Sequence, residues 1–239
     1  MWLQSELKEH AKRVLNVNYW SMIAVTVVSL FASRGVNTFS FFNVYVSDPE
    51  ILDKYLLNGS ISIAFFFGVL SSAAAIANTI ISIVLLSLIV NPLTVGIQRF
   101  YIRSCKERTA PGEIMFGFSR SYKNIIKIMF LKNLYIVLWS MLFVIPGIIK
   151  AYEYRMIPYI LAENPDISTE EAFALSKKMM ENEKLNTFAL DLSFLGWFLL
   201  GAVSLGICLI FYVTPYYNLT NAELYIVLKQ KISRLNTNP

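Results

Sequence analysis

Residues 192–222 read LSFLGWFLLGAVSLGICLIFYVTPYYNLTNA, an uncharged run bounded by Asp191 and Glu223. A helix needs about 20 apolar residues, at a rise of about 1.5 Å each, to cross the hydrocarbon core of a bilayer. The run is therefore too long for one span and indicates two.

A turn signal divides this run. Leu205-Gly206 is the expected tight turn, which predicts one membrane span over residues 187–204 and a second over residues 207–228. Pro215 predicts a kink in the second span.

The other apolar runs are interpreted in the same way. Tyr19 and Trp20 stand at the start of the first run, where aromatic residues meet a membrane surface. Ile145-Pro146-Gly147 breaks the third run from the fourth, and Lys127 and Lys132 extend the third by reaching towards the headgroups. The four remaining predicted spans cover residues 17–34, 65–98, 124–145 and 148–162.

The composition of the whole chain agrees with this pattern. Of 239 residues 56% are hydrophobic and only 15% are charged, and the mean hydropathy is +0.53. A soluble domain carries about a quarter charged residues. The predicted fold is all-α: a polytopic membrane helical bundle of about six transmembrane helices, forming a single integral membrane domain over residues 1–239.

The basic residues gather on one side of the predicted spans. Cations dominate the N-terminal segment, the segment 99–132 and the C-terminus, whereas the loop 34–54 is slightly acidic. The positive-inside rule places both termini in the cytoplasm. The net charge of +5 is explained by this bias, so we expect membrane lipids and no nucleic acid as partners.

Two amphipathic helices are expected at the inner membrane surface. In residues 2–16 an apolar face alternates with charged residues, which favours an interfacial helix over an early start of the first span. In residues 168–183, Ser168 and Glu171 form a capping box. We expect this second helix to lie on lipid, with docking to a partner protein as the alternative.

Charged side chains inside predicted spans define the candidate site, because such charges are costly in lipid. Lys150 and Glu153 are three residues apart and can pair, and either Asp191 or Glu223 can meet Arg155. The functional interpretation is a polar cavity or a substrate pathway. The alternative is structural ion pairs, which the position of these charges near span ends favours. The candidate ligand or polar-cavity residues are Lys150, Glu153, Arg155, Tyr159, Asp191, Tyr216 and Glu223.

Motifs for catalysis and metal binding are missing from the sequence. It contains no P-loop, HExxH or GxSxG motif, its single histidine is His10, and no cluster has metal-ligand spacing. Cys105 and Cys208 indicate no disulfide framework, and no N-terminal signal peptide stands out. We therefore expect no cofactor, no metal and no catalytic residue, and an enzyme is the weaker class.

Several motifs occur together and in order along nearly the whole chain. They are Asn18-Tyr19-Trp20, Gly96-Ile97-Gln98-Arg99-Phe100, Ile145-Pro146-Gly147, Pro158 to Pro165, Ser176 to Met180, Ser193 to Trp197, and Pro215-Tyr216. With these motifs the sequence resembles an uncharacterised bacterial integral-membrane family, domain of unknown function 975. Asn182 is a departure, because a glycine is expected there. The resemblance implies a multi-span protein of the bacterial plasma membrane and supplies no activity.

Three hypotheses for the function remain. The leading one is a non-enzymatic membrane protein that handles a lipid or an amphipathic peptide, in transport, export or immunity at the envelope. The second is a structural or regulatory subunit of a membrane complex, docking through residues 168–183 or the small-residue stretch 71–77. The third is an intramembrane enzyme that depends on Asp191.

Overall fold

The structure is a computed structural model that describes residues 2–30, 77, 81, 84–119 and 121–237. The predicted acidic loop 34–54, residues 71–76 of the small-residue stretch and half of the span 65–98 therefore lie outside the described residues. Within the described residues the chain forms helices and turns and no strand, so the predicted all-α class is confirmed. Two compact units are present, Met1–Ser29 with Asn91–Pro239, and Leu30–Val90. The second is described at its C-terminal end, where Leu86–Val90 (η1) is a π-helix.

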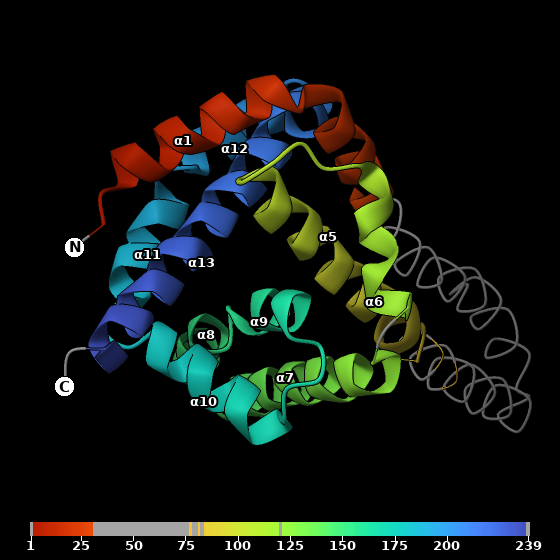
Figure 1. The fold of residues 1–239 in the computed structure, drawn as a ribbon, viewed down its shortest axis with the longest axis vertical. Helices are drawn as coiled ribbons and strands as arrows, with labels where there is room; N and C mark the ends of the chain where they lie inside the picture. Colours follow the sequence, from red (N-terminus) through yellow and green to blue (C-terminus); the bar gives the residue numbers. More distant parts are fainter. Residues whose placement is uncertain (1, 31–76, 78–80, 82–83, 120, 238–239) are drawn as a thin grey trace, which may run out of the picture. The chain divides into compact units, whose positions relative to one another are not determined.

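The first unit holds the candidate site and is shown in Figure 1. Its helices are α1 (Gln4–Val17), α5 (Asn91–Ser104), η2 (Pro111–Met115), α6 (Phe116–Ser119), α7 (Tyr122–Leu142), α8 (Val144–Glu153), α9 (Ile157–Glu163), α10 (Thr169–Met179), α11 (Lys184–Leu192), α12 (Leu195–Val203), η3 (Leu209–Val213) and α13 (Thr214–Thr237). An apolar helix over Tyr19–Leu30 follows α1.

Helix α5 lies at the centre of this unit and packs against η2, α6, α7, α9 and α13. Two glycines allow its closest contacts. A Cβ atom on Gly96 would stand 1.9 Å from the carbonyl oxygen of Ile114, and one on Gly117 would stand 2.0 Å from that of Pro92. Because these contacts are to backbone, no side-chain movement can relieve them.

Helices α7 and α8 form the first hairpin. The chain turns at Phe143, whose φ of -156° and ψ of 144° are extended. The predicted break at Ile145-Pro146-Gly147 is therefore wrong by a few residues. Pro146 lies in the first turn of α8, where its missing N–H removes no helical hydrogen bond. Gly147 lets the helices approach, since a Cβ there would stand 2.7 Å from the Cα of Ser140.

The second hairpin joins α12 to η3 and α13. Leu205 and Gly206 have φ angles of 53° and 87°, so the predicted turn at Leu205-Gly206 is confirmed. The π-helix η3 ends directly before α13, in which Pro215 is the second residue. Proline cannot donate the helical hydrogen bond at its own position, and a local π-helix accommodates such a disruption.

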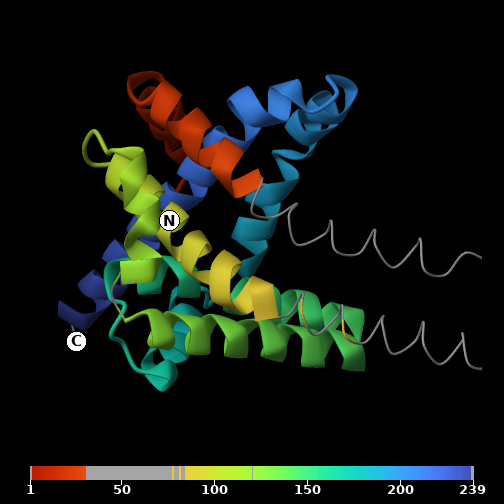
Figure 2. The same cartoon turned by 90° about the vertical axis from the view of Figure 1, so that its right-hand side faces the viewer.

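Both hairpins end in exposed apolar surface. Phe143 and Val144 are 69% and 71% exposed at one end, and Val203 and Leu205 are 84% and 93% exposed at the other. Figure 2 shows both hairpin ends pointing away from the two chain termini. Apolar side chains gathered at this density on the surface mark a contact with lipid or with another protein.

Length and hydropathy identify two helices able to cross a membrane. They are Tyr122–Leu142 and Lys184–Val203, within the described residues. The predicted fourth span is interrupted, because α8 ends at Glu153 and α9 begins at Ile157. The sixth extends into a polar end, because α13 continues to Thr237. Two of the six predicted spans thus coincide with helices that are long and apolar enough to cross a membrane, and the six-span bundle is not confirmed.

The two amphipathic helices pack on protein through their apolar faces, where the sequence predicted contact with lipid. Leu7, Ala11 and Leu15 of α1 are buried, and α1 packs along α13. Helix α10 buries Ala172 and Met179, and packs on α9 and α13. The predicted capping box is confirmed, because Ser168 accepts from the Glu171 N–H and Glu171 accepts from the Ser168 N–H.

The backbone conformation of Asn182 explains why asparagine can replace the glycine that the family pattern leads us to expect. Its φ is 60°, in the left-handed region where glycine is the usual residue and asparagine is the best tolerated alternative. The asparagine therefore makes the same turn after α10 as the expected glycine.

Replacing Gly96 by alanine tests the close packing of α5. The new Cβ would overlap the Ile114 carbonyl, so we expect Gly96→Ala to lower the free energy of unfolding by about 2–3 kcal/mol or more. Gly196→Ala is the matched control, because no heavy atom lies within 4 Å of its Cβ position. Thermal unfolding of both variants in detergent measures the difference. Equal stabilities would contradict the packing.

Candidate functional site

Arg155 and Asp191 form an ion pair between the two hairpins. Arg155 lies in the turn between α8 and α9, and Asp191 lies in α11. Arg155 donates from Nη1 to Oδ2 at 2.5 Å and from Nη2 to Oδ1 at 2.8 Å. The side chains are only 18% and 22% exposed. Two parallel hydrogen bonds between a guanidinium and a carboxylate fix the geometry as well as the charge.

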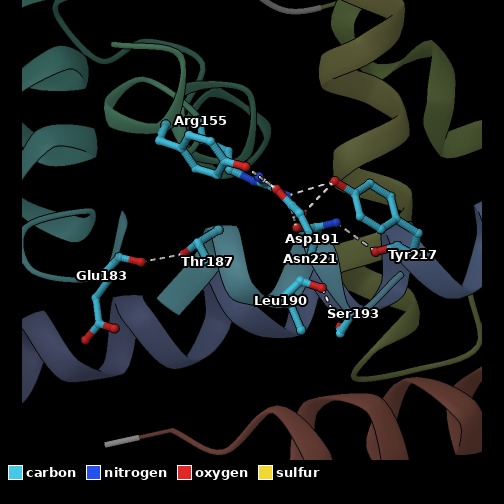
Figure 3. A network of polar contacts seen from close by, with 9 residues as sticks. Arg155, Glu183, Thr187, Leu190, Asp191, Ser193, Tyr217 and Asn221 are labelled. Carbon is cyan, nitrogen blue, oxygen red and sulfur yellow. Dashed lines mark hydrogen bonds and ion pairs between the residues drawn. The ribbon is translucent and has the colours of Figure 1, made fainter. Parts of the chain in front are cut away.

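Three further side chains complete this cluster. Tyr152 and Tyr217 donate to the Asp191 carboxylate at 2.7 and 2.9 Å. Arg155 Nη2 also donates to the Tyr217 hydroxyl at 3.0 Å and to Asn221 Oδ1 at 2.6 Å. Figure 3 shows Arg155, Asp191, Tyr217 and Asn221 converging on one point. We call Tyr152, Arg155, Asp191, Tyr217 and Asn221 the Arg155 cluster. It joins α8, α11 and α13.

The cluster stands at a common depth below both hairpin ends. Arg155 is about a dozen residues from Phe143, and Asp191 and Tyr217 are each about a dozen residues from Leu205-Gly206. At 1.5 Å per residue this is about 18 Å, a little over half of a hydrocarbon core of about 30 Å.

Glu153 anchors a second group of charges. Lys150 and Lys184 donate to its two carboxylate oxygens at 2.9 and 3.0 Å, so the predicted Lys150–Glu153 pair is confirmed. The Glu153 side chain is only 6% exposed. Ser176 of α10 donates to the Glu153 carbonyl oxygen. This group therefore ties α8, α10 and α11 together.

The structure separates the remaining predicted site residues from these groups. Glu223 pairs with His10 at 2.6 Å, so of the two carboxylates proposed for Arg155 it is Asp191 that meets it. Tyr159 stacks on Tyr225 with ring centroids 5.4 Å apart. Tyr216 packs against Phe194 and is 2% exposed. Both tyrosines are thus core residues.

Four contributing residues were not assigned to the site from the sequence. They are Tyr152, Lys184, Tyr217 and Asn221. A signal was present for one of them, since Tyr217 and Asn221 are four residues apart and share a helix face. Nothing local in the sequence places Tyr152 or Lys184 beside its partner.

Helix α1 is held in place by polar contacts along its length. Trp2 Nε1 donates to Glu183 at 2.9 Å, and Lys8 donates to the Ser193 hydroxyl at 2.6 Å. Glu183 also accepts from Lys231 at 2.5 Å and from Asn186 at 2.9 Å. Burial raises the pKa of the Glu183 carboxyl, but these hydrogen bonds outweigh burial and hold the pKa below its ordinary value of 4.5.

Chemically, the Arg155 cluster is closed. Both oxygens of Asp191 accept hydrogen bonds, and Arg155 donates to four acceptor atoms on three residues. A carboxylate held in this way is a poor proton acceptor at neutral pH. The geometry therefore defines an all-helical protein with two exposed apolar hairpins that a buried ion pair connects.

A family model matches part of the chain. Residues 141–232 match the family model described as "Protein of unknown function (DUF975)". The match confirms the resemblance over these residues. All five residues of the Arg155 cluster and both hairpin turns lie within this segment. No curated protein and no solved structure matches the chain.

Removing one member of the ion pair tests its role in the fold. Arg155→Ala leaves the Asp191 carboxylate buried without a cation, so we expect a loss of about 3 kcal/mol or more in stability. The double variant Arg155→Ala/Asp191→Ala removes both charges and should lose less than the sum of the two single losses. The free energies of unfolding of these variants, measured in detergent, give the coupling energy between Arg155 and Asp191. Strictly additive losses would contradict a direct pair.

Acid should loosen α1 through Glu183. Because its pKa is lowered in the folded state, the stabilising contribution is complete above pH 4.5 and is lost as the pH falls through the lowered value. We expect the unfolding temperature to drop in this range, and to drop less in Glu183→Gln. An identical acid dependence of the variant and the unchanged protein would show that Glu183 has no part in it.

Proposed function

We propose that the chain is a multi-pass protein of the bacterial plasma membrane, with six spans and both termini in the cytoplasm. The exposed apolar ends of the two hairpins support this proposal, because lipid covers such surfaces without a partner protein. The cations supply the orientation. Lys123, Lys184 and Lys229 each recur about 20 residues from a hairpin turn, which is the distance across a hydrocarbon core.

In this arrangement the Arg155 cluster lies near the middle of the membrane. Charged residues at that depth are costly, and they mark ligand or ion pathways in many membrane proteins. We further propose that the protein handles an amphipathic ligand, a lipid or a peptide, without catalysing a reaction. The ligand's apolar part would lie along the exposed Ile148 and Ile149 of α8, and its polar part beside the tyrosine hydroxyls.

One observation carries this proposal: a polar, tyrosine-rich cluster lies between the bases of two hairpins whose ends are exposed and apolar. An amphipathic molecule needs these two environments side by side. The bidentate contact between Arg155 and Asp191 holds the ion pair together, and the two tyrosine hydroxyls add polar atoms around it. The hydroxyls of Tyr152 and Tyr217 therefore separate the two roles.

The test uses strains that lack the gene and are complemented by variants. Tyr152→Phe/Tyr217→Phe keeps the ion pair and the ring packing while removing both hydroxyls. We expect this variant to insert and fold, to lose co-purifying lipid or peptide measured by mass spectrometry, and to fail in complementation. Tyr135→Phe is the control, because Tyr135 contacts Tyr154 and Phe173 through its ring, away from the cluster.

Two results would overturn the proposal. One is full complementation by each of four separate variants, which are Tyr152→Phe/Tyr217→Phe, Glu153→Ala, Arg155→Ala and Asp191→Ala. The other is rescue of Arg155→Asp by Asp191→Arg in both folding and complementation, because exchanged charges restore a structural pair and leave a ligand site altered.

A further inference from the structure

A pocket lined by basic residues lies apart from the Arg155 cluster, beside the C-terminal half of α5. Its volume is about 420 Å³. Helix α5 and the residues after it contribute Arg99, Arg103 and Lys106, the end of α9 contributes Glu163, and α13 contributes Lys229. None of the candidate site residues predicted from the sequence lines it.

Two arginines on one wall are held in place by a single carboxylate. Arg99 donates from Nε to Glu113 at 3.0 Å, and Arg103 donates from Nη1 to the other Glu113 oxygen at 2.6 Å. Arg99 also donates to the Ala162 carbonyl at 2.7 Å and stacks on the Phe116 ring at 3.7 Å. A guanidinium carries five N–H groups, so these contacts position both arginines and leave further donors.

The opposite wall is organised in the same way. Glu163 accepts from Lys229 at 2.5 Å and from the Tyr225 hydroxyl at 2.6 Å. Lys106 lies 4.0 Å from the other Glu163 oxygen. The Glu163 carboxylate therefore places two ammonium groups at one edge of the pocket, and the weaker of its two ion pairs is the one with Lys106.

The charges of the pocket do not balance. Its four cations face the carboxylates of Glu107, Glu113 and Glu163, which leaves one positive charge in excess. The three outer cations are accessible, because Arg103, Lys106 and Lys229 are 41%, 60% and 55% exposed. Fixed arginine and lysine donors with excess positive charge are the arrangement that proteins use to bind phosphate.

The position of the pocket agrees with such a ligand. Glu163 and Lys229 stand about 20 residues from the hairpin turns, so in the proposed topology they lie at the inner surface of the membrane. Basic pockets between helices at that surface bind the headgroups of anionic lipids. A soluble phosphate compound from the cytoplasm would meet the same donors.

We propose that this pocket binds the phosphate group of an anionic ligand through Arg103, Lys106 and Lys229, with Arg99, whose side chain is 19% exposed, as the least exposed donor. The phosphate belongs either to an anionic glycerophospholipid headgroup or to a soluble phosphate compound. This site is separate from the one proposed for the amphipathic ligand and does not depend on it.

The test compares two triple variants of the full chain in phosphatidylcholine nanodiscs. Arg103→Gln/Lys106→Gln/Lys229→Gln removes the outer cations of the pocket. Arg13→Gln/Lys123→Gln/Lys177→Gln removes three exposed cations elsewhere, so both variants lose the same charge. One arm adds phosphatidylglycerol and counts retained lipids by native mass spectrometry. The other titrates inorganic phosphate and follows its binding by calorimetry.

We expect the pocket variant to lose at least about tenfold in affinity in one arm or both, and the control variant to bind as the unchanged protein does. Loss in the lipid arm alone assigns the headgroup, and loss in the phosphate arm assigns a soluble ligand. Equal loss in the two variants, or binding by neither probe to the unchanged protein, would overturn the proposal. If the triple variant does not fold, the exposed single variant Lys106→Gln is measured in the same arms, with Lys177→Gln as its control.

Discussion

A charged side chain that is buried away from water is stable only when it is paired with an opposite charge. In this fold Arg155 and Asp191 form such a pair. Arg155 follows α8 and Asp191 precedes α12, and each buried charge would be strongly unfavourable alone. The bidentate contact, with Tyr152, Tyr217 and Asn221 around it, satisfies both charges at once. The relative position of α8, α11 and α13 follows from it. The polar atoms at the bases of the hairpins are therefore paired within the protein. The exposed ends of the hairpins carry apolar side chains.

Other parts of the structure follow the same rule on a smaller scale. Glu153 is paired with two lysines, Glu183 with Lys231 and Trp2, and Glu163 with Lys229 and Tyr225. Glu153 draws its donors from α8 and α11, whereas both donors to Glu163 of α9 lie on α13. The body of the protein is thus held by a few carboxylates that several helices share, whereas the basic pocket beside Glu163 retains more positive than negative charge.

The sequence predicted the features that depend on local pattern. The helical class, the turn at Leu205-Gly206, the capping box at Ser168 and the Lys150–Glu153 pair each need only neighbouring residues. The break between α7 and α8 was misplaced, because Pro146 was taken as the point of interruption although proline fits the first turn of a helix. The packing of α1 and α10 on α13 and α9 could not be predicted, since an amphipathic face is equally suited to lipid and to protein. Asp191 was one of the two partners predicted for Arg155, but Tyr217 and Asn221 could not be predicted, because they lie on α13, far from Arg155 in the sequence.

The depth of the Arg155 cluster in the membrane is the central claim, and a spin label next to it measures that depth. Leu192 follows Asp191 and is 52% exposed, so a label on Leu192→Cys, in a chain with Cys105→Ser and Cys208→Ser, reports on this level. We expect the label to be accessible to oxygen and shielded from a water-soluble nickel complex, as at the centre of a bilayer. A label at residue 192 that the nickel complex reaches as readily as one on Arg13→Cys would contradict the account.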